Sequence, residues 1–382
     1  MILRLLSALA LLLSPLGSTA ADWIELRFGP EFTFANRYGR YSDRDEMRLK
    51  RNLERHLIGG QQTGSEFNYR VDGDRPVMVS PNGWSFDVIR DVTVAEFRMA
   101  PMTLKDFKRF KSDIQDAIFI SAANVGLFPW AFLGGGHISV GVDEFTSNPL
   151  LTYNFIVDFF NHNELALGVL GFDSNNATPL SMASESIRNS VKEVLDSFAL
   201  RLRNDPGSAT SNELFRLLAN AYRKDERYSS VWRVAPYSKH VDLSAYDWMG
   251  NHHHNGRLEI RCVRPQRDIE TWINQIELLQ ARLNLLKRRR TPLGFKPKVP
   301  IAEPLKLSFA DDGHLLNPPV DPQLALASFY TYVTESGLKW DDHRSYIWPA
   351  WITSGELSKF EEGDFFKARN SNAPSSCATA LL

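Results

Sequence analysis

The sequence predicts an α+β protein in which helices cover one face of a mainly antiparallel sheet. Short segments that alternate apolar and polar residues indicate strands with one buried face. Longer segments with an apolar residue every three or four positions indicate helices that pack through one side. Strands and helices follow one another irregularly along the chain, which favours an α+β sheet over a regular βαβ repeat.

The composition is that of an ordinary globular protein and gives no sign of a polyanionic partner. The chain has 382 residues, of which 43% are hydrophobic and 23% charged. Its 44 basic and 45 acidic residues nearly cancel, so we expect no nucleic-acid partner. The two cysteines, Cys262 and Cys377, lie in a predicted strand and in a Ser/Ala-rich tail, and we expect both to be free thiols.

The N-terminus has the pattern of a secretory signal peptide over residues 1–21. Arg4 precedes an apolar run over residues 5–13, and the small residues Ser18, Ala20 and Ala21 follow it. The run is too short to span a bilayer, so we expect a mature form without a stable membrane anchor. The pattern predicts a secreted or periplasmic protein with a Sec-type signal.

The first predicted strand lies within residues 23–34 and separates two kinds of side chain. Its apolar residues share one face, because alternate side chains of a strand point to opposite sides. Gly29, Glu31 and Thr33 share the other face with Glu25 and Arg27. One face is therefore expected to join the core, and the other is polar.

Three later segments, over residues 92–98, 136–142 and 256–263, repeat this separation. Their polar sides carry Glu96 and Arg98; His137, Ser139 and Gly141; and Arg257, Glu259 and Arg261. If all four strands pair in one sheet, its polar face gathers three glutamates, a histidine and several arginines. A solvated face is the plain alternative.

Helices are expected between and after these strands. A capping box at Thr103 starts the first, and Asp268 caps the longest. The others are predicted over residues 149–160, 181–203 and 211–223.

The C-terminal part differs from the rest of the chain in its composition. Residues 291–322 hold seven prolines and are expected to wrap or link, whereas residues 323–382 form a small helical appendage with a disordered tail. Residues 22–290 then make up the main domain.

The residue types on the polar face suit a nucleotide site. Carboxylates and imidazoles are ligands for divalent cations, and arginines bind phosphate through two parallel hydrogen bonds.

The motifs that carry these residues resemble the carboxylate–amine ligases of the glutamine-synthetase and glutamate–cysteine-ligase superfamily, and the amidoligase branch in particular. The similar segments are Phe-Gly-Pro-Glu-Phe at 28–32, Glu-Phe-Arg-Met-Ala-Pro at 96–101, Gly-Gly-His-Ile-Ser-Val-Gly at 135–141, Lys-His-Val-Asp-Leu at 239–243 and Gly-Arg-Leu-Glu-Ile-Arg at 256–261. Together they span about residues 23 to 290.

The resemblance implies a sheet of the glutamine-synthetase catalytic type with the active site on the face away from the helices. It further implies that ATP and Mg²⁺, or Mn²⁺ in its place, drive phosphoryl transfer to a carboxylate and that an amine attacks the acyl phosphate. The implied metal ligands are Glu31, Glu96, His137 and Glu259. The implied phosphate contacts are Arg261, Arg257 and Lys239, with Arg261 and Glu259 as catalytic residues. A small amino acid, a peptide or a cell-wall fragment is the expected substrate.

Two departures from the family pattern keep other functions open. Thr33 and Ser139 stand where the resemblance implies a second glutamate and a second histidine. Fewer anionic ligands would hold a metal less tightly. A secreted binding protein without catalysis is therefore one alternative. A kinase-like phosphotransferase is another, because guanidino kinases share a related catalytic sheet.

Three further motifs have simpler explanations. We expect the histidines at 252–254 to form a solvated turn and residues 161–164 to form an exposed helix end. The basic residues 287–290 suit the C-terminal end of a helix dipole.

Overall fold

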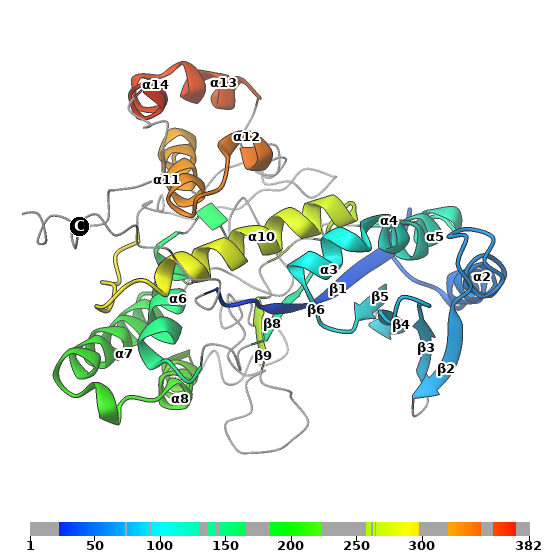
Figure 1. The fold of residues 1–382 in the computed structure, drawn as a ribbon, viewed down its shortest axis with the longest axis horizontal. Coiled ribbons are helices and arrows are strands. Elements are labelled where there is room, and N and C mark those ends of the chain that lie inside the picture. The colour runs from blue at the N-terminus through cyan, green and yellow to red at the C-terminus, as the bar shows by residue number, and fades with distance from the viewer. Residues whose placement is uncertain are drawn as a thin grey trace, which may run out of the picture.

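The computed structural model is an α+β fold, with an antiparallel sheet and helices packed against it (Figure 1). It describes residues 23–72, 75–91, 93–129, 136–141, 146–162, 164–165, 180, 184–222, 257–260, 263, 265–297, 320–344 and 354–371. The predicted signal peptide lies outside these residues, as do both cysteines. Within the described residues, no helix combines the length and the apolar character needed to cross a bilayer.

Within the described residues one sheet contains nine strands, in the order β2-β3-β4-β5-β1-β8-β9, with β6 and β7 also paired to β1. Each pair is antiparallel. The strands are β1 (Arg27–Asn36), β2 (Asn68–Asp72), β3 (Arg75–Val79), β4 (Ser85–Asp91), β5 (Val94–Met99), β6 (Met102–Thr103), β7 (Leu127–Phe128), β8 (Ile138–Gly141) and β9 (Arg257–Ile260). The predicted pairing of four polar-faced strands in one sheet is thereby confirmed.

The helices confirm most sequence expectations. Within the described residues they are α2 (Asp43–Leu53), η2 (Glu54–Ile58), α3 (Leu104–Arg109), α4 (Lys111–Ile114), η3 (Gln115–Ile120), α5 (Ser121–Asn124), α6 (Pro149–Asn161), α7 (Glu185–Asn204), η6 (Pro206–Ser208), α8 (Ser211–Tyr222), α10 (Ile269–Leu286), α11 (Pro322–Glu335), α12 (Trp340–His343), α13 (Ser354–Glu362) and α14 (Asp364–Ser371). Thr103 and Asp268 cap α3 and α10, because their side chains accept hydrogen bonds from the backbone N–H groups of Asp106 and Thr271.

β1 lies beneath α10 (Figure 1), and its apolar residues belong to the same core as those of α10 and η3. The ring of Phe32 lies 4.9 Å from that of Phe119 and 5.5 Å from that of Trp272, centroid to centroid. Phe34 also contacts Phe119, at 5.6 Å. These aromatic side chains are all buried. The helices therefore occupy one face of the sheet and leave the other to the polar side chains, as the alternation of β1 predicts.

The strand predicted over residues 23–34 begins later than expected, at Arg27. Amide side chains of α10 form hydrogen bonds with the backbone groups of the residues just before Arg27. Gln280 accepts from Leu26 N at 2.8 Å and donates to Ile24 O at 2.6 Å, and Asn284 accepts from Ile24 N at 2.9 Å. Two buried amides thus replace a neighbouring strand and attach the N-terminal end of β1 to α10.

The single helix expected from Thr103 is broken instead. It divides at Phe110 and widens into the π-helical segment η3 before α5. The carbonyl of Asp116 accepts hydrogen bonds from Gln62 Nε2 at 2.7 Å and Ser121 Oγ at 3.2 Å. A π-turn leaves backbone groups without ordinary helical partners, and here side chains take that role.

The C-terminal helices α11 to α14 are joined by an aromatic cluster. Tyr330 lies 5.3 Å from Trp340 and 5.1 Å from Phe366, and Trp340 lies 5.9 Å from Phe360. Helices therefore form in the segment predicted as a small helical appendage. The predicted domain boundaries at 290 and 322 stay predictions.

Candidate functional site

The register of the sheet brings the polar residues of β1, β5, β8 and β9 to one face. Glu31 lies opposite Arg98, and Thr33 opposite Glu96. A Cβ placed on Gly29 would lie 3.5 Å from the Cβ of Ser139, so these two residues also share that face. Alternation along each strand then assigns the whole group to the side away from α10.

Glu31 and His137 are in direct contact at the centre of this face. The Glu31 carboxylate lies 2.7 Å from Nδ1 of His137, and the imidazole is 4% exposed. The backbone fixes this pair as well, because Glu31 N donates to His137 O at 3.2 Å. The sequence prediction that these two residues converge is confirmed.

Glu96 is the buried carboxyl next to this pair. Burial raises the pKa of Glu96 from 4.5 to about 7, and repulsion from Glu31 adds to the effect. The charges of His137 and Arg98 lower that pKa but do not reverse the shift. A carboxyl whose charged form is destabilised in this way is poised to accept a cation.

Arg98 is the cation next to Glu96, and Asp87 holds it in place. Arg98 Nε donates to Asp87 Oδ1 at 3.0 Å, and Nη2 forms a second short bond to Oδ2. This hydrogen bonding raises the pKa of Arg98. Arg98 Nε also lies 3.9 Å from Glu96 Oε1. Sequence reasoning missed Asp87, although residues 85–88 alternate in the same way, with Phe86 and Val88 opposite Asp87.

The remaining predicted site residues are described only in part. The backbone of Glu259 lies opposite that of Ser139, and the backbone of Arg257 opposite that of Gly141. Arg261 and Lys239 lie outside the described residues, as do the histidines at 252–254. Their assignment as phosphate contacts stays a prediction.

The side chains on this face do not form a ready metal site. Among the described residues, no group of three or more His, Cys, Asp or Glu side chains has the arrangement that a metal ion requires. The donor types of Glu31, Glu96 and His137 suit a divalent cation. The contact between Glu31 and His137 would have to open for both to bind the same ion.

The two residues that depart from the family pattern, Thr33 and Ser139, are buried. Thr33 is 3% exposed and Ser139 6%. Ser139 Oγ has no hydrogen-bond partner among the described residues. Together with Glu96 and His137 these side chains exclude the plain alternative of a solvated sheet face.

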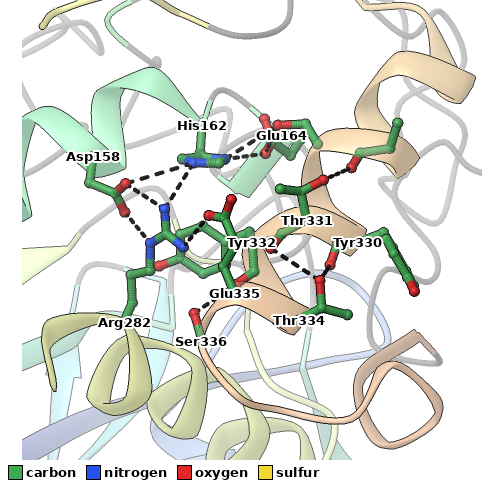
Figure 2. A network of polar contacts seen from close by, with 12 residues as sticks. Asp158, His162, Glu164, Arg282, Tyr330, Thr331, Tyr332, Thr334, Glu335 and Ser336 are labelled. Atoms are coloured by element: carbon green, nitrogen blue, oxygen red, sulfur yellow. Dashed lines mark hydrogen bonds and ion pairs between the residues drawn. The ribbon is translucent and has the colours of Figure 1, made fainter. Parts of the chain in front are cut away.

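A second polar network lies apart from the sheet, where α6, α10 and α11 meet (Figure 2). Arg282 donates to both oxygens of Asp158 at 2.7 Å and to Glu335 at 3.2 Å. The ring of Tyr332 covers its guanidinium at 4.4 Å. Arg282 and Asp158 are both buried, so this pair belongs to the interior of the fold.

His162 extends this network. Its Nδ1 lies 2.7 Å from Glu164 Oε1, which also accepts from Ser328 Oγ at 2.7 Å. The prediction of an exposed helix end at residues 161–164 is therefore wrong for His162 and Glu164, which are 0% and 2% exposed. The cause is α11, whose Ser328 reaches Glu164 from a distant part of the chain.

The serine, histidine and glutamate of this network do not form a catalytic triad. Both Ser328 Oγ and Glu164 lie near Nδ1 of His162, at 3.3 Å and 2.7 Å, whereas Nε2 faces Arg282 at 3.5 Å. A triad needs the serine on one ring nitrogen and the carboxylate on the other. The network is structural.

Comparison with known proteins gives no family assignment. No family model matches the sequence, and no curated protein matches it. Among solved structures, the complex between the prokaryotic ubiquitin-like protein Pup and its ligase PafA is similar at 12% identity. The match covers 91% of this chain and 67% of that chain, with a TM-score of 0.32. A TM-score this low does not establish a shared fold.

Proposed function

We propose that this protein is a ligase that joins a carboxylate to an amine with ATP and a divalent cation, through an acyl phosphate. The observation that carries the proposal is that the buried Glu96 and His137 and the partly buried Glu31 lie together on the sheet face away from the helices. Burying a carboxylate beside a second acidic group is costly unless a cation or a proton compensates the charge. A metal ion and a phosphate bound on this face would compensate the charges of these side chains and so account for the free-energy cost of burying them.

The proposed ligands for Mg²⁺ or Mn²⁺ are Glu31, Glu96, His137 and Glu259, and the proposed phosphate contacts are Arg261, Arg257 and Lys239. A bound divalent ion would neutralise negative charge on the ATP phosphates during phosphoryl transfer. Arg261 and Glu259 are the proposed catalytic residues. Arg98, held by Asp87, adds a positive charge beside Glu96.

Glu96 gives the proposed site a proton that a metal must displace. Burial raises its pKa to about 7, so near neutral pH the carboxyl carries a proton for part of the time. Binding of a divalent ion favours the charged carboxylate and releases that proton. Metal affinity is therefore expected to fall as the pH drops below about 7.

A second candidate function is ligand binding without catalysis. Thr33 and Ser139 are uncharged and buried on this face, and the described residues hold no complete set of metal ligands. A protein of this kind would use the same face to hold a carboxylate or phosphate group. A kinase-like phosphotransferase would use the same metal and phosphate contacts but would stop at a phosphorylated product.

We also propose that residues 1–21 direct the chain to the periplasm or the outside of the cell. A ligase there would need a supply of ATP, for example in a compartment that the protein enters after export. Its expected substrates remain a small amino acid, a peptide or a cell-wall fragment.

The test combines nucleotide binding with product analysis. Calorimetry on the chain without residues 1–21 should show ATP binding that requires Mg²⁺ or Mn²⁺, and Glu96→Gln and Arg261→Ala should each abolish it. Glu66→Gln, a change at an exposed residue, serves as the matched control. No binding with either metal would contradict the proposal.

The products separate the three functions. ADP and an amide formed from a carboxylate and an amine identify the ligase. ADP and a phosphorylated product without an amide identify the phosphotransferase. Ligand binding with no ADP release from any carboxylate and amine pair identifies the binding protein.

A further inference from the structure

A row of arginines lies along one side of the helical segment formed by α2 and η2. Arg44, Arg48, Arg51 and Arg55 are all exposed. At about 100° per residue, these four positions fall within an arc of about 60° on the helix. With a rise of about 1.5 Å per residue, the row is about 16 Å long.

The four arginines form no salt bridge within the described chain, although Arg48 interacts electrostatically with the buried Asp45 of the same helix. The acidic residues Asp43 and Glu46 lie on a different side of the helix, about 110° to 170° from the row. Arg90 contacts both of them, at 2.6 Å and 4.0 Å. Asp45, which is buried, and Glu54, which is exposed, lie about 90° from the centre of the row. The arginine side itself therefore carries a net positive charge.

The turn before α2 adds two more exposed arginines and an aromatic residue. Arg37 and Arg40 are exposed, and their guanidinium carbons lie 4.7 Å and 5.9 Å from the ring centre of Tyr38. Tyr38 itself is 66% exposed, and Met47 on α2 is 54% exposed. We call the six arginines together the arginine surface: Arg37, Arg40, Arg44, Arg48, Arg51 and Arg55.

The position of α2 leaves this surface open to a large partner. α2 lies at the outer end of the molecule beside the sheet, away from the C-terminal helices (Figure 1). The buried side of α2, which includes Leu49 and Leu53, faces the core.

The chemistry of the arginine surface selects phosphate. Arginine binds phosphate oxygens in a planar, two-bond geometry, and six such groups suit a partner with many phosphates. A nucleic-acid groove would enclose the helix on both sides and bring Asp43, Glu46 and Glu54 close to phosphates. A flat bilayer surface would instead contact only the side of the helix that carries the arginines. Tyr38 and Met47 suit the boundary between lipid headgroups and acyl chains.

We propose that the arginine surface binds the headgroups of a bilayer that contains anionic phospholipid, and so attaches the protein reversibly to the membrane. This association is independent of the ligase proposal, because the arginine surface shares no residue with the site on the sheet. It is peripheral binding by a folded domain and needs no membrane-spanning helix.

The test measures sedimentation of the chain without residues 1–21 with vesicles. The protein should bind vesicles of phosphatidylglycerol and phosphatidylcholine at low salt, bind pure phosphatidylcholine vesicles weakly, and dissociate as salt is raised. Each arginine near an anionic surface contributes about fivefold in affinity, so Arg44→Gln, Arg48→Gln and Arg51→Gln together should weaken binding about hundredfold. Melting curves check that the variant is folded.

A charge-matched control comes from the other basic cluster. Arg288→Gln, Arg289→Gln and Arg290→Gln remove the same charge from exposed residues after α10 and should leave vesicle binding unchanged. Equal losses in both triple variants would overturn the proposal, as would wild-type binding in the α2 variant. Binding to a short DNA duplex without binding to vesicles would overturn it in favour of nucleic acid. If the α2 variant melts early, Arg37→Gln with Arg40→Gln should weaken binding about 25-fold, and no loss in that variant overturns the proposal.

Discussion

The raised pKa of Glu96 makes the stability of this protein depend on pH in a way that one substitution removes. In the folded chain the pKa is about 7, against 4.5 for an ordinary glutamate. Between these values the folded chain holds a proton that the unfolded chain releases, so folding is favoured less as the pH rises. The stabilisation is complete below about pH 4.5 and is lost as the pH rises through about 7.

The magnitude follows from the pKa difference. A difference of about 2.5, at about 1.36 kcal/mol for each pKa unit, corresponds to about 3 kcal/mol. Glu96→Gln keeps the shape of the protonated side chain and removes its titration. Relative to the wild type, the variant should therefore gain about 3 kcal/mol of unfolding free energy between about pH 4.5 and about pH 8.

Urea unfolding followed by circular dichroism measures this difference, in a metal chelator so that no divalent ion reaches the site. Both proteins must show a single transition for the comparison to hold. Glu66→Gln, at an exposed residue, should follow the wild type at every pH. The same pH dependence in wild type and Glu96→Gln would refute the assignment of a buried, proton-holding carboxyl at this position.

Three more perturbations test the core, the buried network and the site. Arg282→Met leaves the buried carboxylate of Asp158 unpaired and should lower the unfolding free energy, measured in urea, by about 3–5 kcal/mol. Lys192→Met removes an exposed ion pair and should change it by less than about 1 kcal/mol. Equal effects of the two substitutions would contradict the burial of the network. Trp272→Ala empties a fully buried position under the sheet and should cost about 3–5 kcal/mol in the same assay, and a loss below about 1 kcal/mol would contradict that packing. His137→Asn should weaken Mn²⁺ binding in calorimetry at least tenfold if the imidazole is a ligand, and an unchanged affinity would remove it from the ligand set.

The central part of the candidate site could be predicted from the sequence because strand alternation is a local property. Gly29, Glu31 and Thr33 are separated from their apolar neighbours by the two-residue period alone. The same rule places Glu96 and His137, and the sheet register then brings these residues together. The prediction needed only the assumption that the strands pair with one another.

Other features depended on contacts between distant segments and left no local signal. The late start of β1 follows from Gln280 and Asn284, more than 250 positions away in the sequence. His162 and Glu164 follow a helix end, where polar residues are usually exposed, and their burial follows from Ser328 on α11. Such pairings are set by tertiary packing and lie beyond what periodicity can indicate.

The position of α11 in the chain has a consequence for how the protein is made. Ser328, Tyr332 and Glu335 complete the surroundings of Arg282 and Glu164, yet they belong to a segment that the ribosome produces after α6 and α10. Until that segment emerges, the guanidinium of Arg282 lacks Tyr332 and Glu335, and the carboxylate of Glu164 lacks Ser328. The nascent chain therefore reaches its full native stability only after synthesis has passed α11, and a premature stop codon ahead of this helix yields a polypeptide with a wetted, incompletely closed interior.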